Sequence, residues 1–130
     1  MSHICIIDDD ETSRAFVAMA MEAADHEVTE CESATTFVSQ YLNTSFDLII
    51  SDVYMPDMDG YELLRTIKEN SGVPVIIMSA GSSYDLGNKQ KLNLTLEMAN
   101  DFGADAVLSK PIDADKLIEL VDESIAKYLA

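Results

Sequence analysis

Five polar residues that could perform chemistry each follow a short apolar run. Asp8 and Asp9 come directly after one run, Asp52 ends a second, Ser79 ends a third and Lys110 follows a fourth. If these runs are parallel strands of one sheet, their carboxyl ends meet at the same edge and bring the five residues together. Three carboxylates, a hydroxyl and an amine in one place are suited to binding a divalent cation and a phosphoryl group.

The three carboxylates require a cation nearby, because each close pair repels by about 4 kcal/mol at a surface-like dielectric. Mg²⁺ commonly binds carboxylates, water and a phosphoryl oxygen, so it is the cofactor that we expect, with Mn²⁺ as an alternative. Lys110 would supply a second positive charge, and Ser79 a hydroxyl donor to a phosphoryl oxygen. Asp52 would then act as a carboxylate nucleophile that forms an acyl phosphate, stabilised by the two cations.

The elements that must position these residues alternate along the chain. Strand patterns cover His3–Asp8, His26–Cys31, Phe46–Asp52, Val73–Ser79 and Ala106–Ser109. Helix patterns cover Glu11–Ala24, Thr35–Leu42 and Tyr61–Glu69, and a last helix begins after an Asp113 N-cap and runs to about Tyr128. This alternation predicts an α/β fold with a parallel sheet, in which the polar second strand lies near an edge.

Two helices show apolar faces that predict how they pack. The first carries Phe16, Met19, Ala20 and Ala23 on one face, and the last directs Leu117, Leu120, Val121 and Ile125 inward. The stretch from Ala80 to Phe102 fits either a strand or a helix, and its length between two strands favours a helix.

Composition limits the functions that the chain can have. It has 130 residues, a size that suits a single domain covering residues 1–130, with 48% hydrophobic residues and a net charge of −16. A surface this negative disfavours direct binding of nucleic acid or anionic membrane. The chain shows no transmembrane run and no secretory signal. Cys5 and Cys31 lack metal-ligand spacing, and we interpret both as reduced structural residues of a cytoplasmic protein.

The residues around these strand ends also form motifs. They are Ile7-Asp8-Asp9, the string Ser51-Asp52-Val53-Tyr54-Met55-Pro56-Asp57-Met58-Asp59-Gly60, Met78-Ser79-Ala80 and Ser109-Lys110-Pro111. Over essentially its whole length the chain resembles the receiver domain of two-component response regulators, of the stand-alone, chemotaxis-regulator-like kind. The Asp-x-x-Met-Pro-x-Met-Asp-Gly string is highly specific for that family.

The resemblance assigns a role to each residue. Asp52 is implied to be the phosphorylated aspartate, and Asp8 and Asp9 the acidic pair that binds Mg²⁺ together with Asp52 and the backbone carbonyl of Tyr54. Ser79 is implied to move toward the phosphoryl group, and Lys110 to contact it. The bond between Lys110 and Pro111 is expected to be cis.

The resemblance also implies the fold and the function. The fold would be a (βα)₅ flavodoxin-like three-layer sandwich with a five-stranded parallel sheet of order 2-1-3-4-5. The protein would be a signalling switch, not a metabolic enzyme, that catalyses its own phosphorylation and dephosphorylation. Its donor would be a histidine kinase or a histidine phosphotransfer protein. Its output would pass through the face around the fourth helix, fifth strand and fifth helix to a downstream protein, as a monomer or a phosphorylation-dependent dimer.

Three features depart from the family pattern. Val107 stands three residues before the lysine, where the family usually has Tyr or Phe, whose rotamer follows the movement of the Ser/Thr residue. Valine is too short and stiff for that movement. The segment from Gly81 to Gln90 is longer than usual and is either a tolerated insertion or a partner-recognition element. Tyr54 and Gly81 occupy positions that influence hydrolysis, so we expect Tyr54→Ala to change dephosphorylation more than phosphorylation.

The same residues are also compatible with other kinds of protein. A haloacid-dehalogenase-type phosphatase also forms an aspartyl phosphate, but it needs a second aspartate where this chain has Tyr54. A flavodoxin-like electron carrier shares the fold, but it needs a phosphate-binding loop rich in Ser, Thr and Gly after the first strand. The chain could also be a piece of a larger regulator or hybrid kinase.

Overall fold

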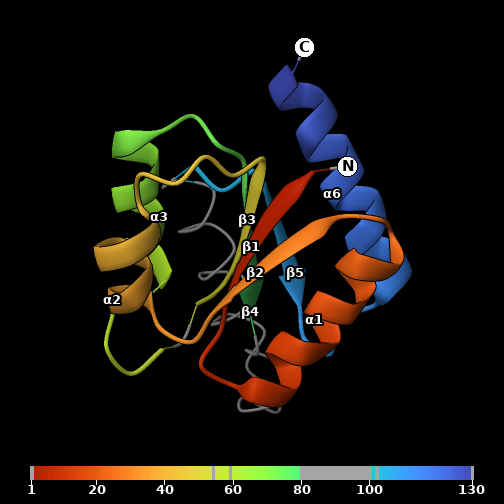
Figure 1. The fold of residues 1–130 in the computed structure, drawn as a ribbon, viewed down its shortest axis with the longest axis horizontal. Helices are drawn as coiled ribbons and strands as arrows, with labels where there is room; N and C mark the ends of the chain where they lie inside the picture. Colours follow the sequence, from red (N-terminus) through yellow and green to blue (C-terminus); the bar gives the residue numbers. More distant parts are fainter. Residues whose placement is uncertain (1, 54, 59, 80–100, 102, 130) are drawn as a thin grey trace.

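The structure is a computed structural model that describes residues 2–53, 55–58, 60–79, 101 and 103–129. Its centre is a five-stranded sheet in which all neighbouring strands are parallel and the order is β2-β1-β3-β4-β5 (Figure 1). The strands are β1 (His3–Ile7), β2 (Glu27–Cys31), β3 (Leu48–Asp52), β4 (Val75–Ser79) and β5 (Ala106–Ser109). The predicted fold class and strand order are confirmed.

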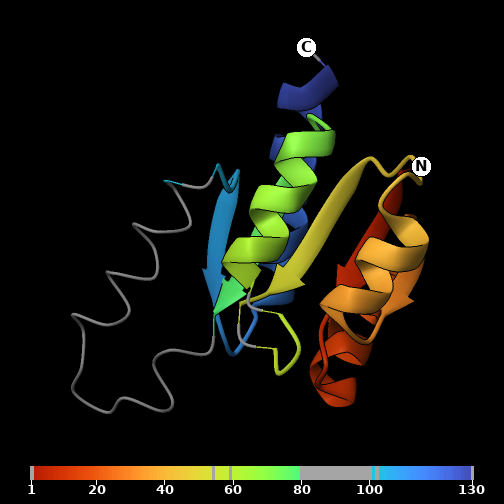
Figure 2. The ribbon, with the colours of Figure 1, turned by 90° about the vertical axis from the view of Figure 1, so that its left-hand side faces the viewer.

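Helices cover both faces of the sheet. α1 (Glu11–Ala23) and α6 (Ala114–Leu129) lie on one face, and α2 (Ala34–Thr36), the π-helical turn η1 (Phe37–Tyr41) and α3 (Gly60–Asn70) lie on the other (Figures 1 and 2). Each face therefore has its own buried cluster, one containing Met21 and Val121 and the other containing Phe37 and Leu64. The helix predicted between Ala80 and Phe102 lies outside the described residues, apart from position 101.

The strand sequences account for the order of the sheet. Every residue of β3 and β4 is buried, as expected for strands that are covered on both faces. β2 leaves Glu27 and Glu30 exposed and lies at the edge, which confirms its predicted position. The carboxyl ends of the parallel strands therefore share one edge of the sheet.

The predicted buried face of α1 is wrong apart from Ala20, which is buried. Phe16 is 45% exposed and Met19 is 71% exposed, whereas Val17 and Met21 are fully buried. The stretch from residue 15 to residue 21 is apolar on every side, so periodicity alone could not select a face. The buried face is the one that packs with residues of the sheet and α6, and the helix begins after Asp10, whose side chain accepts a hydrogen bond from the Thr12 N–H as the N-cap.

The other end of the chain follows the sequence pattern closely. The Asp113 carboxylate accepts hydrogen bonds from the N–H groups of Asp115 and Lys116, so it caps α6 as predicted. Leu117, Val121 and Ile125 are buried as predicted, and Leu120 is half-buried. None of the helices in the described ranges is long and apolar enough to cross a membrane.

Both cysteines are buried and free. They lie in the cluster between the sheet and α2–α3, and burial raises the pKa of each thiol above its ordinary value of 9.0. Thiols held in this form are poor nucleophiles, which agrees with the interpretation of Cys5 and Cys31 as structural residues.

Candidate functional site

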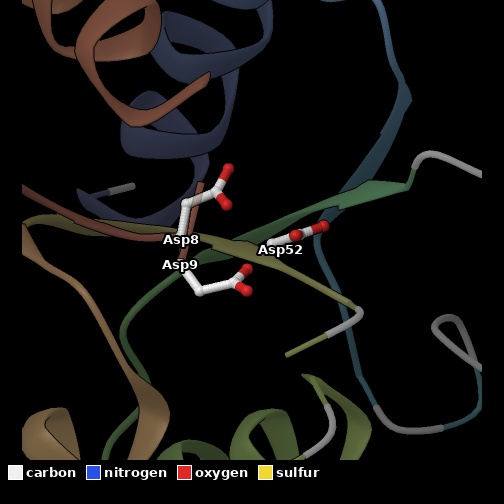
Figure 3. Close-up of side chains that lie close together, drawn as sticks. All are labelled: Asp8, Asp9 and Asp52. Carbon is white, nitrogen blue, oxygen red and sulfur yellow. The ribbon is translucent and has the colours of Figure 1, made fainter. Parts of the chain in front are cut away.

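Three carboxylates meet at the carboxyl edge of the sheet. Asp8 and Asp9 directly follow β1, and Asp52 ends β3 (Figure 3). One oxygen from each carboxylate can be chosen so that all three oxygens lie within 4.8 Å of one another. Asp8 is fully buried and Asp52 is 5% exposed, while Asp9 faces solvent. The predicted convergence of these side chains therefore exists in the structure.

Lys110 completes this group from the end of β5. Its Nζ atom lies 3.1 Å from Asp8 Oδ2 and 3.5 Å from Asp52 Oδ2, and its peptide bond to Pro111 is cis. Burial lowers the pKa of Lys110, but the nearby carboxylates of Asp52 and Asp8 outweigh burial and raise that pKa above 10.5. Lys110 is therefore a fixed positive charge between the two buried carboxylates.

Asp52 is the carboxylate whose protonation is most perturbed. Burial and, to a smaller extent, the charge of Asp8 raise its pKa from 3.8 to about 6, against the opposing effect of Lys110. Its Oδ1 atom accepts a hydrogen bond from the Val53 N–H at 2.9 Å. At neutral pH Asp52 is therefore ionised, but its charge is held in an unfavourable environment that a further cation would relieve.

Every polar group of Asp8 has a hydrogen-bond or ion-pair partner. Its N–H donates to the Cys31 carbonyl at 3.1 Å, and its Oδ1 accepts from the Asp10 N–H at 2.9 Å. Its own carbonyl accepts from Arg14 Nη1 at 2.7 Å, a contact that the sequence analysis missed. The position of Arg14 one helical turn after the acidic run was the only sequence signal for it.

Gly60 allows the loop after Asp52 to fold back onto the strand. A Cβ atom at this position would lie 2.6 Å from both the Asp52 carbonyl oxygen and Val53 Cα, and the Gly60 N–H donates to the Val53 carbonyl at 2.7 Å. Real Cβ atoms do not approach backbone this closely. The glycine of the motif is therefore required by packing against the end of β3.

The remaining predicted site residues lie in different situations. Ser79 is fully buried at the end of β4, where its carbonyl accepts from the Lys110 N–H at 2.7 Å. Val107 lies on β5 and its half-buried side chain packs against the cluster on the α2–α3 face. Tyr54, Gly81 and the segment from Gly81 to Gln90 lie outside the described residues.

This set of donors fits Mg²⁺. Mg²⁺ is a hard cation that prefers oxygen ligands and retains several waters, so an exposed carboxylate beside two buried ones gives it both ligands and access to solvent. At the same edge of the sheet, Lys110 provides a positive charge that can bind a phosphoryl group. The arrangement can therefore hold a divalent cation and a transferring phosphoryl group next to the Asp52 carboxylate.

A profile of the response regulator receiver domain matches residues 4–122. The chain belongs to this family. The assignment decides against the phosphatase and the electron carrier, since receivers are the phosphorylation-dependent signalling domains of two-component systems.

Two curated relatives illustrate the match of this receiver domain. The DNA-binding transcriptional regulator NtrC of Klebsiella pneumoniae is 35% identical over 124 residues, which are 95% of this chain and 24% of NtrC. The transcriptional regulatory protein FixJ of Bradyrhizobium diazoefficiens is 32% identical over 124 residues, which are 95% of this chain and 56% of FixJ. The chain thus spans from about a quarter to just over half of the length of these relatives.

Solved receiver structures have the same fold. A CheY-like response regulator receiver domain protein from Methanospirillum hungatei is 26% identical, with a TM-score of 0.82 over 98% of this chain and 95% of that chain. Full-length FixJ from B. japonicum is 31% identical, with a TM-score of 0.82 over 97% of this chain and 58% of that chain.

One further contact links the loop after the receiver's acidic site to α2. An Asp57 carboxylate oxygen, Oδ2, accepts hydrogen bonds from both the N–H and the hydroxyl of Thr35, and these bonds lower the pKa of Asp57 below 3.8. Because 22 residues separate the partners, no local pattern in the sequence predicts the contact. The contact between Asp57 and Thr35 attaches the loop after β3 to α2.

Proposed function

We propose that this receiver domain is a phosphorylation switch in which Asp52 accepts a phosphoryl group from a phosphohistidine in the presence of Mg²⁺. The observation that carries the proposal is the cluster of three carboxylates within 4.8 Å, with Lys110 Nζ at 3.1 and 3.5 Å from two of them. Asp8, Asp9, Asp52 and the carbonyl of Tyr54 would hold the cation. When bound, Mg²⁺ supplies positive charge that stabilises the phosphoryl oxygens.

The transfer begins with an ionised Asp52. The Oδ2 atom of its carboxylate attacks phosphorus, the P–N bond of the phosphohistidine breaks, and the imidazole nitrogen leaves with the electron pair and is then protonated. The product is an acyl phosphate on Asp52. In dephosphorylation, water attacks phosphorus, the P–O bond to Asp52 breaks, and the products are inorganic phosphate and the original carboxylate.

Lys110 and Ser79 serve this chemistry from the neighbouring strand ends. Lys110 moves partly away from Asp52 and binds a phosphoryl oxygen. Its positive charge therefore stabilises the negative charge of the reacting groups throughout the transfer. The Ser79 hydroxyl donates to another phosphoryl oxygen. Tyr54 and Gly81 set the access of water, and therefore the lifetime of the acyl phosphate.

The output is a conformational change. Binding of the phosphoryl group shifts a conformational equilibrium of the face around the fourth helix (the helix expected between Ala80 and Phe102), β5 and α6. This face controls a downstream protein. Val107 on β5 takes the place of the usual aromatic reporter, so the change is carried by other residues of that face. The donor is a cytoplasmic histidine kinase or a histidine phosphotransfer protein. Residues 1–130 act as one domain.

The test is the intact mass of the protein after incubation with acetyl phosphate and MgCl₂. We expect one phosphoryl adduct on the wild type and on Asp115→Asn, an exposed control on α6, and none on Asp52→Asn. EDTA added beforehand should prevent the adduct. Absence of an adduct both with acetyl phosphate and with phosphoramidate, a small donor with a P–N bond, would contradict the proposal.

A further inference from the structure

Arg14 contacts Asp8 directly, and the proposed chemistry gives it no role. Its Nη1 donates to the Asp8 carbonyl at 2.7 Å, and its Nε donates to Glu30 Oε1 at 3.2 Å. The Arg14 side chain is 16% exposed, although it carries a charge, and Glu30 is 47% exposed. One planar guanidinium thus connects the turn after β1 with the edge strand β2.

Arg14 contacts the peptide group that joins Asp8 to Asp9. The Asp8 carbonyl belongs to the peptide bond with Asp9, so holding this oxygen fixes the plane of the peptide and the direction in which the chain continues. Among the described residues no hydrogen bond or ion pair holds the Asp9 carboxylate. The direction of that carboxylate therefore depends on the backbone that Arg14 holds.

The folding of α1 brings Arg14 to this position. The Arg14 N–H donates to the Asp10 carbonyl at 2.9 Å in the first turn, and Val17, Ala18 and Met21 follow on the same side of the helix, all buried. The turn from Asp8 to Asp10 is thus closed by contacts within the turn and by one long side chain that reaches back from the helix.

We infer that Arg14 is a positioning residue that sets the Asp8–Asp9 turn in the geometry needed to bind Mg²⁺. The inference rests on the proposed function, and Arg14 itself touches neither the cation nor the phosphoryl group. The charge of Arg14 and its positioning contact with Asp8 would affect the affinity for Mg²⁺ in opposite directions. A positive charge near the cluster repels Mg²⁺, so its removal should strengthen binding if charge alone mattered, whereas loss of the positioning contact should weaken binding.

The experiment is calorimetric titration of the full chain with MgCl₂ at a temperature well below the melting transition of every variant. We expect Arg14→Gln to weaken Mg²⁺ binding by about tenfold, which is typical when a group that orients a metal ligand is removed. Arg65→Gln is the matched control, because Arg65 lies on α3 with 63% exposure and pairs only loosely with Glu69 at 3.9 Å. It should bind Mg²⁺ as the wild type does.

Arg14→Lys provides a second variant that keeps the charge. Lysine has one donor group at the end of its chain, so it cannot hold the Asp8 carbonyl and Glu30 with the planar geometry of arginine. We therefore expect weaker Mg²⁺ binding for Arg14→Lys as well. In ¹⁵N spectra, the amide signals of Asp9 and Asp10 should need more MgCl₂ to shift in both variants than in the wild type.

Several results would overturn the inference. Arg14→Gln and Arg14→Lys that bind Mg²⁺ as tightly as the wild type would do so, even if both melt at a lower temperature, because Arg14 would then be only structural. An equal loss of affinity in Arg65→Gln would do so too. A wild type that binds no Mg²⁺ would instead refute the proposed function, and the inference with it, so the two failures are distinguishable.

Discussion

Replacement of Asp52 by asparagine should stabilise the protein while abolishing its proposed chemistry. The Asp52 carboxylate is 5% exposed, and burial together with the charge of Asp8 raises its pKa from 3.8 to about 6 despite the opposing effect of Lys110. A raised pKa in the folded state means that folding favours the protonated carboxyl. Ionisation of Asp52 at neutral pH therefore costs stability, and the neutral asparagine avoids this cost.

The magnitude follows from the two pKa values. At about 1.36 kcal/mol for each pH unit between 3.8 and 6, ionised Asp52 costs about 3 kcal/mol of unfolding free energy above pH 6. The pKa of about 6 already includes the attraction to Lys110, but the buried amide of asparagine needs hydrogen-bond partners of its own, so we expect a net gain of about 2 kcal/mol at pH 7.5 in the absence of Mg²⁺. In a domain of 130 residues this corresponds to a melting temperature higher by about 8 °C.

The dependence on pH distinguishes this explanation from better packing. The difference between Asp52→Asn and wild type should be small near pH 4, grow between pH 4 and pH 6, and then stay constant, because in that range the unfolded wild type has already lost the proton that the folded wild type still holds. Thermal unfolding followed by circular dichroism measures it. Glu119→Gln, which removes one charge from an exposed position on α6, is the control and should leave the melting temperature nearly unchanged.

Two results would refute this reasoning. One is an Asp52→Asn variant that is no more stable than the wild type at pH 7.5 without Mg²⁺. The other is a gain in stability that does not change between pH 4 and pH 7.5. Saturating MgCl₂ should reduce the difference, because the cation offsets the charge of Asp52 in the wild type only.

Three further substitutions test other parts of the site. Lys110→Ala should lower the unfolding free energy by about 3 kcal/mol, since it leaves its buried carboxylate partners without their cation; urea unfolding measures this, and an unchanged midpoint would contradict it. Gly60→Ala should cost about 2 kcal/mol and slow the formation of the adduct from acetyl phosphate, because the new Cβ would displace the backbone at the end of β3. Asp57→Asn should lower the melting temperature at pH 7, and the difference should disappear as the pH falls below 3.8, because the bonds from Thr35 stabilise only the ionised carboxylate. A difference that does not become smaller as the pH falls below 3.8 would contradict the last prediction.

The sequence predicted the sheet and the acidic cluster well because both depend on local patterns. Short apolar runs that end in Asp8, Asp52, Ser79 and Lys110 indicate parallel strands, and the topology of such a sheet brings their ends together. The Asp113 cap was equally predictable, because its partners lie two and three residues away.

The remaining features depend on contacts between distant parts of the chain. The face of α1 was predicted wrongly because an apolar run such as that around Val17 offers several faces, and packing with the sheet and α6 selects one of them. The contact between Asp57 and Thr35 has no local signature. The bridge from Arg14 to Glu30 depends on the register of β2 beside β1.

The most direct test of the central claim is the position of the acyl phosphate. The wild type is incubated with acetyl phosphate and MgCl₂ and reduced with borohydride, which converts an aspartyl phosphate to homoserine, and the peptides are then sequenced by tandem mass spectrometry. We predict homoserine at position 52 alone. Homoserine at position 8 or 9, or a phosphorylated protein with Asp52 unchanged, would contradict the assignment of Asp52 as the nucleophile.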